Sequence, residues 1–169
     1  ILQQIIKKGY TTTLLSGDKK SKCEYLAKNL GISHVYSEQL PQEKINIITE
    51  TVNKYPTAML GDGINDAPAL AKATVGISLG NATQIAIQTA DVVLLNNDSL
   101  EQLPKLLSIG KHTLTTIKQN LFWAFSYNII AIPMAISGMI NPMWAALFMA
   151  FSDVIVIGNS IRLRYKNIF

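Results

Sequence analysis

The stretch Gly-Asp-Gly-Ile-Asn-Asp-Ala-Pro-Ala-Leu occupies residues 61–70 and follows a short apolar run at 57–60. It places two carboxylates, Asp62 and Asp66, four residues apart on a glycine-rich turn. Mg²⁺ in proteins is held by one or two carboxylates together with phosphate oxygens and water. Glycines let the backbone approach a phosphoryl group closely. The stretch therefore predicts a phosphate-handling loop at the end of a strand.

Around this loop, short apolar runs alternate with helical patterns, which predicts an α/β fold with one parallel sheet and helices on both faces. The expected strands are 11–15, 34–36, 57–60, 75–79 and 91–95, and the expected helices are 19–30, 41–52, 68–72 and 83–89. Ligands of such sheets bind beyond the carboxyl ends of the strands. Both polar loops, Ser16-Gly17-Asp18 and residues 61–66, fall at such ends. We therefore expect them to face one pocket.

Two more side chains are predicted to serve this pocket. Ser16 offers a hydroxyl group, and Lys44, near the start of the helix that opens at Pro41, offers a positive charge. A hydroxyl, a lysine and two carboxylates can together stabilise the charge that develops in phosphoryl transfer. The alternative is an ordinary solvated loop at each position. That alternative is stronger for Ser16 and Lys44 than for the aspartate pair.

The chain becomes much more apolar in its last third. Residues 121–140 form a stretch without a charged side chain, and this stretch is long enough to cross about 30 Å of hydrocarbon. A turn at Asn141 and Pro142 follows, and residues 142–163 form a second apolar run that is charged only at Asp153 before Arg162. This pattern predicts a transmembrane helical hairpin. The alternative is a buried helical pair in a soluble core.

The charge distribution supports the hairpin and gives it an orientation. Residues 1–100 carry balanced charges, whereas residues 101–169 hold six basic side chains against two acidic ones, the whole excess of +4. These basic residues flank the apolar runs, so residues 1–118 and the C-terminal tail are expected in the cytoplasm and the Asn141 turn on the far side. Basic residues placed around apolar runs do not suggest nucleic-acid binding. The single Cys23 excludes an intrachain disulfide and fits a reducing compartment.

Several polar side chains lie inside the apolar runs, where they are costly and therefore suggest function. Asn128 and Asp153 are expected about 20 and 18 Å from the far side, so they could meet across the hairpin. Met149, Ser152 and Asp153 share one helical face, and Tyr127 adjoins Asn128. These five residues form a candidate site for a transported ion. Hydrogen bonding between helices is the alternative for Asn128 and Ser152, and simple packing is the alternative for Met149.

The quoted stretch resembles the hinge signature of the P-type ATPases, whose fold is haloacid-dehalogenase-like. Ser16-Gly17-Asp18 resembles the Thr-Gly-Asp motif of the family, and residues 40–44 (Leu-Pro-Gln-Glu-Lys) resemble its proline-to-lysine segment. The match continues through residues 75–77 and 90–94 and covers essentially the whole chain. The hinge signature is highly specific, and the other motifs are weak when taken singly.

This resemblance implies a role for each matching residue. Asp62 and Asp66 match the carboxylates that bind Mg²⁺, Lys44 matches the lysine that pairs with the phosphorylated aspartate, and Ser16 matches the hydroxyl that contacts the phosphoryl group. The implied catalytic set is Ser16, Gly17, Asp18 and Lys44, and the implied cofactor-binding set is Gly61, Asp62, Gly63, Asn65 and Asp66.

The membrane residues resemble the metal-binding pattern of copper-transporting members. Tyr127-Asn128 is followed by Met149 and Ser152, where the family has Met-x-x-Ser-Ser, and thioether sulfur suits Cu(I). Here Asp153 stands in place of the second serine. A carboxylate favours Zn²⁺, Mn²⁺ or Co²⁺, or a proton-linked step, so a divalent-ion pump is the alternative to the favoured copper pump.

The resemblance also implies a domain organisation. Residues 1–98 would be the C-terminal part of the phosphorylation domain, 99–119 a connecting helix, 120–163 the transmembrane hairpin and 164–169 a cytoplasmic tail. The Asp-Lys-Thr-Gly-Thr run that carries the phosphorylated aspartate is not in this sequence. The chain also opens inside an amphipathic helical pattern, so we expect a piece of a longer pump that is inactive alone.

The implied cofactors are Mg²⁺, ATP and the transported metal ion. The implied partners are the lipid bilayer, the nucleotide-binding domain, the actuator domain, the other membrane helices and, as a further candidate, a metallochaperone. A non-catalytic fragment or an accessory Mg²⁺-binding membrane protein remains the alternative. A free-standing membrane phosphatase of this fold is disfavoured, because no Asp-x-Asp nucleophile is present in the sequence.

Overall fold

A computed structural model describes residues 1–95, 100–139 and 141–165 of the chain. The chain forms two compact units, Ile1–Pro104 and Lys105–Phe169. The predicted boundary at residue 98 and the last part of the predicted tail, residues 166–169, lie outside the described residues.

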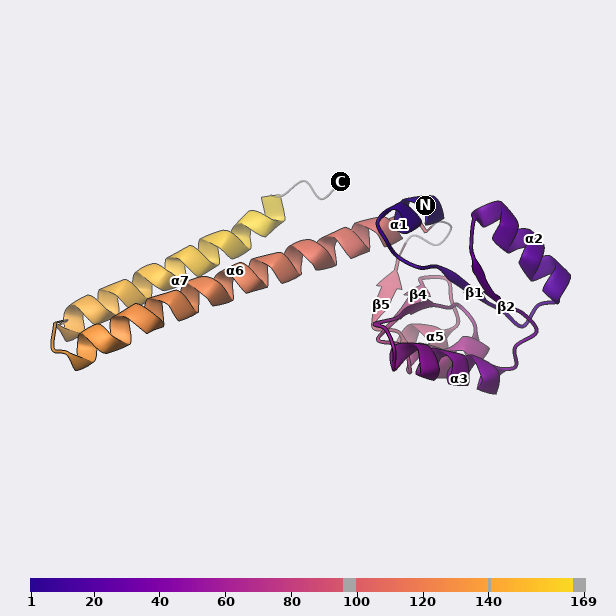
Figure 1. The fold of residues 1–169 in the computed structure, drawn as a ribbon, viewed down its shortest axis with the longest axis horizontal. Coiled ribbons are helices and arrows are strands. Elements are labelled where there is room, and N and C mark those ends of the chain that lie inside the picture. Colours follow the sequence, from indigo (N-terminus) through magenta and orange to yellow (C-terminus); the bar gives the residue numbers. More distant parts are fainter. Residues whose placement is uncertain (96–99, 140, 166–169) are drawn as a thin grey trace. The chain divides into compact units, whose positions relative to one another are not determined.

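The first unit alternates strands and helices (Figure 1). Its elements are α1 (Leu2–Lys7), β1 (Thr13–Leu15), α2 (Lys20–Leu30), β2 (His34–Tyr36), α3 (Pro41–Val52), β3 (Ala58–Leu60), the 3₁₀ turn η1 (Ile64–Asp66), α4 (Ala67–Leu70), β4 (Val75–Leu79), α5 (Gln84–Thr89) and β5 (Val92–Leu94). Local chemistry sets several of these ends. Helix α2 ends at Gly31, whose φ of 73° is in the left-handed region that glycine adopts without strain. The Thr83 hydroxyl accepts a hydrogen bond from the backbone N–H of Ala86 and so caps the start of α5.

The strands are all parallel, as the alternation predicts, but they form two sheets where we expected one. Strand β1 pairs with β2, and β4 lies between β3 and β5 in a separate three-stranded sheet. Among the described residues no strand joins β1 to β3, so each of these two strands keeps a free edge facing away from its own sheet. The prediction of one sheet was wrong, because the alternation of strands and helices along the chain predicts that the strands run parallel but not which of them exchange hydrogen bonds.

The two sheets nevertheless share one hydrophobic core. Ile48 of α3, Met59 of β3 and Leu70 of α4 are at most 8% exposed and lie in one cluster. Leu15, at the end of β1, packs against this cluster from the other sheet. The ends of β1 and β3, where the polar loops begin, are therefore held in one compact body.

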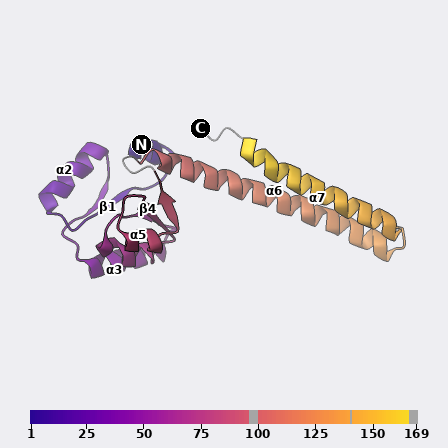
Figure 2. The same ribbon diagram turned by 180° about the vertical axis from the view of Figure 1, so that it is seen from behind.

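The second unit is a helical hairpin. Its helices α6 (Gln102–Ile136) and α7 (Pro142–Tyr165) lie side by side over the length of α7, as both views show (Figures 1 and 2). The phenol of Tyr127 donates a 3.0 Å hydrogen bond to the carbonyl of Ala145 across the pair. Near the other end, the side-chain amides of Asn120 and Asn159 donate to Ser160 Oγ and to Asn120 Oδ1, each at 2.8 Å. These bonds set the register of the hairpin.

The two helices differ in their suitability for crossing a membrane. Within the described residues, α7 contains one segment, Met143–Tyr165, that is long and apolar enough to span. Helix α6 does not meet the same test. It is continuous from the predicted connecting region into the predicted first span, but it ends at Ile136 instead of continuing toward residue 140. The part of the predicted span that is helical in α6 is therefore residues 121–136, about 16 residues or about 24 Å.

Candidate functional site

The turn after β3 folds Asp66 back over the two glycines. Gly61 N donates to Ile77 O of β4 at 3.1 Å, and Asp66 N donates to Gly63 O at 3.1 Å. The contact at Gly61 is so close that a Cβ built there would lie 2.8 Å from Asp66 Cβ, and no real Cβ accepts such a distance. A Cβ at Gly63 would meet Asp66 Oδ2 at an ordinary 3.6 Å. The carboxylate of Asp66 therefore lies against the backbone of the turn.

An ion pair joins this turn to α3. Lys44 Nζ lies 2.8 Å from Asp66 Oδ1, and the two side chains are only 12% and 18% exposed. The side chains of the Lys20–Glu24 and Lys22–Asp18 ion pairs, in contrast, are more than half exposed. Removing one partner from a mostly buried pair leaves an uncompensated charge, so the Lys44–Asp66 pair couples α3 firmly to the turn.

The start of α3 contacts both polar loops. Leu40 N donates to Glu43 Oε2 at 2.7 Å, which satisfies a free N–H at the helix start. One residue earlier, Gln39 N donates to Ser16 O at 3.1 Å, and one residue after Glu43, Lys44 reaches Asp66. The segment from Gln39 to Lys44 is thus a bridge between the loop after β1 and the turn after β3.

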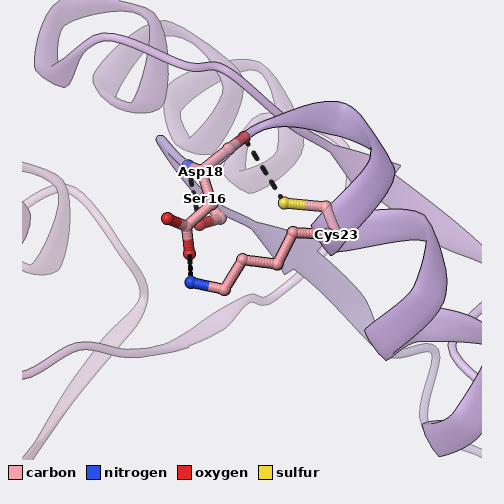
Figure 3. Close-up of polar contacts among 4 residues, drawn as sticks. Ser16, Asp18 and Cys23 are labelled. Atoms are coloured by element: carbon pink, nitrogen blue, oxygen red, sulfur yellow. Dashed lines mark hydrogen bonds and ion pairs between the residues drawn. The ribbon is translucent and has the colours of Figure 1, made fainter.

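The loop after β1 is held by its own contacts (Figure 3). Asp18 N donates to Ser16 Oγ at 3.1 Å, and the Asp18 carboxylate accepts a 3.0 Å hydrogen bond from Lys22 Nζ. The thiol of the buried Cys23 donates to Asp18 O at 3.5 Å. Gly17 lies exposed between Ser16 and Asp18. Among the described residues, no hydrogen bond runs directly from this loop to residues 61–66.

The two aspartates of the turn are arranged differently. Asp62 is exposed; its carbonyl accepts from Thr83 N at 3.0 Å, whereas its carboxylate has no hydrogen-bond partner in the described part of the chain. Asp66 uses Oδ1 for Lys44 and has no such partner at Oδ2. Asn65 is exposed in η1 between them. The turn thus presents free carboxylate oxygens from two residues next to a lysine.

This donor set fits a magnesium ion only in part. No group of three or more Asp, Glu, His or Cys side chains that could hold a metal ion occurs among the described residues. Two carboxylates with free oxygens still match the way Mg²⁺ binds, since the ion takes its remaining ligands from phosphate and water. Asp62 and Asp66 would therefore hold the ion only together with a phosphorylated partner.

The structure separates the five membrane-site candidates into two groups. Tyr127 and Ser152 line a groove between α6 and α7. Asn128, Met149 and Asp153 are exposed, Met149 to 61%. The amide of Asn128 donates to Ala124 O of its own helix at 3.0 Å, and it makes no hydrogen bond to Asp153 in the described residues. The five residues are not brought together by this chain alone.

Two residues of the soluble site were not singled out from the sequence. Glu43 caps α3 and so fixes the turn of helix that carries Lys44, and Lys22 holds the Asp18 carboxylate. Glu43 stands three residues after Leu40, the residue that precedes the first turn of α3, and this spacing is the sequence signal of such a cap. Lys22 stands four residues after Asp18, the spacing of a helical ion pair.

Comparison with known proteins identifies related chains over both units. The family model of haloacid dehalogenase-like hydrolases matches residues 1–74. A copper-exporting P-type ATPase of Mycobacterium leprae is 43% identical over 93% of this chain, which spans 20% of that protein. A probable copper-importing P-type ATPase A of Enterococcus hirae is 44% identical over 99% of this chain, which spans 23% of that protein.

A solved structure extends the similarity to the fold. The crystal structure of a zinc-transporting PIB-type ATPase in the E2.Pi state covers 96% of this chain with a TM-score of 0.91 and 31% identity. This chain covers 26% of that protein. The chain thus spans about a fifth to a quarter of the length of the relatives it matches.

Proposed function

Because this chain belongs to the heavy-metal P-type ATPases, as a C-terminal portion of about 170 residues, we propose that it carries half of the phosphorylation site and a membrane hairpin of an ATP-driven metal pump. The observation that carries the proposal is the mostly buried pair of Lys44 and Asp66, which holds a lysine beside free carboxylate oxygens at the end of β3. A pocket of this composition stabilises transferring phosphoryl groups.

The hydroxyl and charged side chains of the site each have a role in this proposal. Lys44 neutralises charge on the phosphorylated aspartate, and the Ser16 hydroxyl donates a hydrogen bond to a phosphoryl oxygen. Asp62 and Asp66 hold Mg²⁺, which would neutralise charge on the transferring phosphoryl group when bound. Asp18, held by Lys22, keeps the loop after β1 in place beneath that group.

The acceptor aspartate must come from a segment outside this sequence. The free edges of β1 and β3, in two parallel sheets that share one core, favour a further strand between them. We propose that this strand belongs to the rest of the pump and ends at the acceptor aspartate, beside the Ser16 and Asp62 loops. The 169-residue chain by itself is then expected to lack ATPase activity.

Phosphoenzyme formation tests this function. The full-length protein, incubated with labelled ATP, Mg²⁺ and the transported metal, should form an acid-stable and hydroxylamine-sensitive adduct, the property of an aspartyl phosphate. The 169-residue chain alone should form none. If the full-length reading frame lacks an acceptor aspartate, or forms no metal-dependent adduct, the non-catalytic alternative holds.

The hairpin is proposed to span the membrane with its Asn141 turn on the far side and both outer ends in the cytoplasm. Its apolar side chains support this, because they are not covered by this chain: Phe122, Ile129, Phe151 and Ile157 are all more than half exposed. An apolar surface of this extent requires lipid or other helices as cover. The domain boundaries expected from the sequence at 119 and 163 belong to the same proposal.

We propose that the transported ion binds on one side of the hairpin. Both helices are right-handed, and they run in opposite directions. The residue that follows an interface residue therefore faces the same side of the pair on either helix. Asn128 follows Tyr127 and Asp153 follows Ser152, and Met149 lies one turn before Asp153. Asn128, Met149 and Asp153 therefore share one side, where other pump helices would complete the site.

The metal is proposed to be Cu(I) or a divalent relative of it, since the related pumps include copper and zinc transporters. Asp153→Ser restores the serine of the copper pattern. Because a carboxylate favours divalent ions and a thioether favours Cu(I), the substitution is expected to raise ATPase stimulation by Cu(I) relative to Zn²⁺ about tenfold, or about 1.4 kcal/mol.

The measurement is ATPase stimulation of the full-length pump across Cu(I), Zn²⁺ and Mn²⁺. Ala150→Ser is the matched control, because it adds a hydroxyl on α7 without removing the carboxylate, and it should leave the ratio unchanged. An unchanged ratio in Asp153→Ser would show that Asp153 does not select the ion.

A further inference from the structure

The hairpin has a groove of about 220 Å³ between its two helices. Aromatic and aliphatic side chains make up most of its lining: Trp123, Ser126, Tyr127, Ile130, Phe148, Phe151, Ser152 and Ile155. The phenol of Tyr127 is already bonded to Ala145 O. The groove is thus a hydrophobic slot, and Phe151 on its rim is 65% exposed.

The groove opens on the side of the hairpin opposite to the polar residues. Ser126 and Phe151 each precede an interface residue, Tyr127 and Ser152, whereas Asn128 and Asp153 each follow one. By the geometry of an antiparallel pair, the preceding residues turn to one side and the following residues to the other. A carboxylate in a bilayer faces protein or water, so the Asp153 side is the one that the rest of the pump covers. The groove side is then free to face lipid.

Arg162 lies on the groove side, toward the basic end of the hairpin. It follows Ile155 by seven residues and Phe151 by eleven, about two and three helical turns, so the three share one stripe on α7. It is about 10 Å along the axis from Ile155. Arg162 is exposed, and none of the described carboxylates pairs with it. Arg164, in contrast, lies three turns after Asp153, on the other side.

We propose that this groove binds an anionic phospholipid, with its phosphate against Arg162 and one acyl chain between α6 and α7. The guanidinium group can bind a phosphate oxygen pair in bidentate fashion, and the hydrophobic slot begins about one lipid-headgroup length below it. The inference rests on the proposed membrane hairpin and adds a lipid site on its free side.

Fluorescence quenching of Trp123 tests the lipid site, because Trp123 lines the groove and the chain has only two tryptophans. The 169-residue chain carrying Trp144→Phe is reconstituted in phosphatidylcholine vesicles that contain a rising fraction of phosphatidylglycerol or phosphatidylcholine brominated on its acyl chains. Half-maximal quenching is expected at an about fivefold lower fraction of brominated phosphatidylglycerol than of brominated phosphatidylcholine, the preference expected from one arginine near the surface.

Arg162→Gln is expected to make the two brominated lipids equally effective, and Arg164→Gln, its matched control two residues away, should keep the preference. If the two brominated lipids quench equally in the chain that keeps Arg162, the lipid site is overturned, while the inserted hairpin stands. An equal loss of preference in Arg164→Gln would overturn it too, because it would indicate general surface charge. Absence of quenching by either lipid would mean that the hairpin does not insert, which overturns the proposed hairpin itself.

The same comparison in the full-length pump excludes a protein occupant. There the Trp123 signal is isolated as the difference from Trp123→Phe. Persistence of the fivefold preference supports the lipid, and its loss in the assembled pump would show that another helix fills the groove and would overturn the proposal.

Discussion

Replacing Lys44 with methionine is expected to lower the metal-stimulated ATPase activity of the full-length pump by about 10²–10³-fold, the loss found when one group that stabilises transition-state charge is removed. Methionine keeps most of the length of the side chain and removes the ammonium group, with its charge and its hydrogen-bond donors. The Asp66 side chain, which is only 18% exposed, then loses the ammonium group that lies 2.8 Å from its Oδ1 in the unmodified protein. The measurement is the initial rate of ATP hydrolysis at saturating metal and Mg²⁺.

Two further variants separate charge from folding. Lys54→Met removes a lysine just beyond the end of α3 that is exposed and makes no ion pair among the described residues, so it should keep nearly full activity. Lys44→Arg retains the charge and should recover the fold and part of the rate, since a guanidinium places its donors differently from an ammonium. Activity of Lys44→Met within a few-fold of the unmodified pump would refute the assigned role of Lys44.

Gly61→Ala is expected to reduce the same activity by at least about 10²-fold, because a misplacement of about 1 Å at a reacting centre has an effect of that size. The new Cβ would lie 2.8 Å from Asp66 Cβ, so the carboxylate must move away from the turn and from Lys44. A higher Mg²⁺ concentration for half-maximal activity should accompany the loss.

Gly63→Ala is the matched control two residues away. Its Cβ would meet Asp66 Oδ2 at 3.6 Å and Asn65 N at 3.9 Å, both ordinary contacts, and the φ of −99° at Gly63 suits any residue. Activity should stay within a few-fold of the unmodified pump. If both alanine variants lose activity equally, the loss comes from general rigidity of the loop and not from displacement of Asp66.

Much of the local structure could be predicted from residue types alone. Val75–Leu79 is a strand with the expected bounds, α2 stops at Gly31, and α3 begins at Pro41. These features depend on interactions within a few residues: β-branched runs, a left-handed glycine and a proline at the first helical turn. The hinge signature is likewise local, because it consists of the contiguous residues 61–70.

The length of the first apolar run illustrates the limit of such patterns. Hydrophobicity continues through residues 121–139, but α6 stops at Ile136 and Gly138 has a φ of 70°. Apolar composition does not distinguish a helical residue from a turn residue. Helix length, and with it the suitability of α6 to cross a membrane alone, depends on where the chain reverses.

The residue types and spacing of the chain were sufficient to establish the parallel α/β unit, the polar loops at its strand ends and the existence of an apolar hairpin, because each follows from short-range periodicity. Three features needed the folded chain: the split into two sheets, the 2.8 Å pair of Lys44 and Asp66, and the placement of Asn128 and Asp153 away from the groove. Each depends on how elements far apart in sequence pack together. Lys44 and Asp66 are 22 residues apart, and only the shared core beneath α3 and β3 brings them within hydrogen-bonding distance.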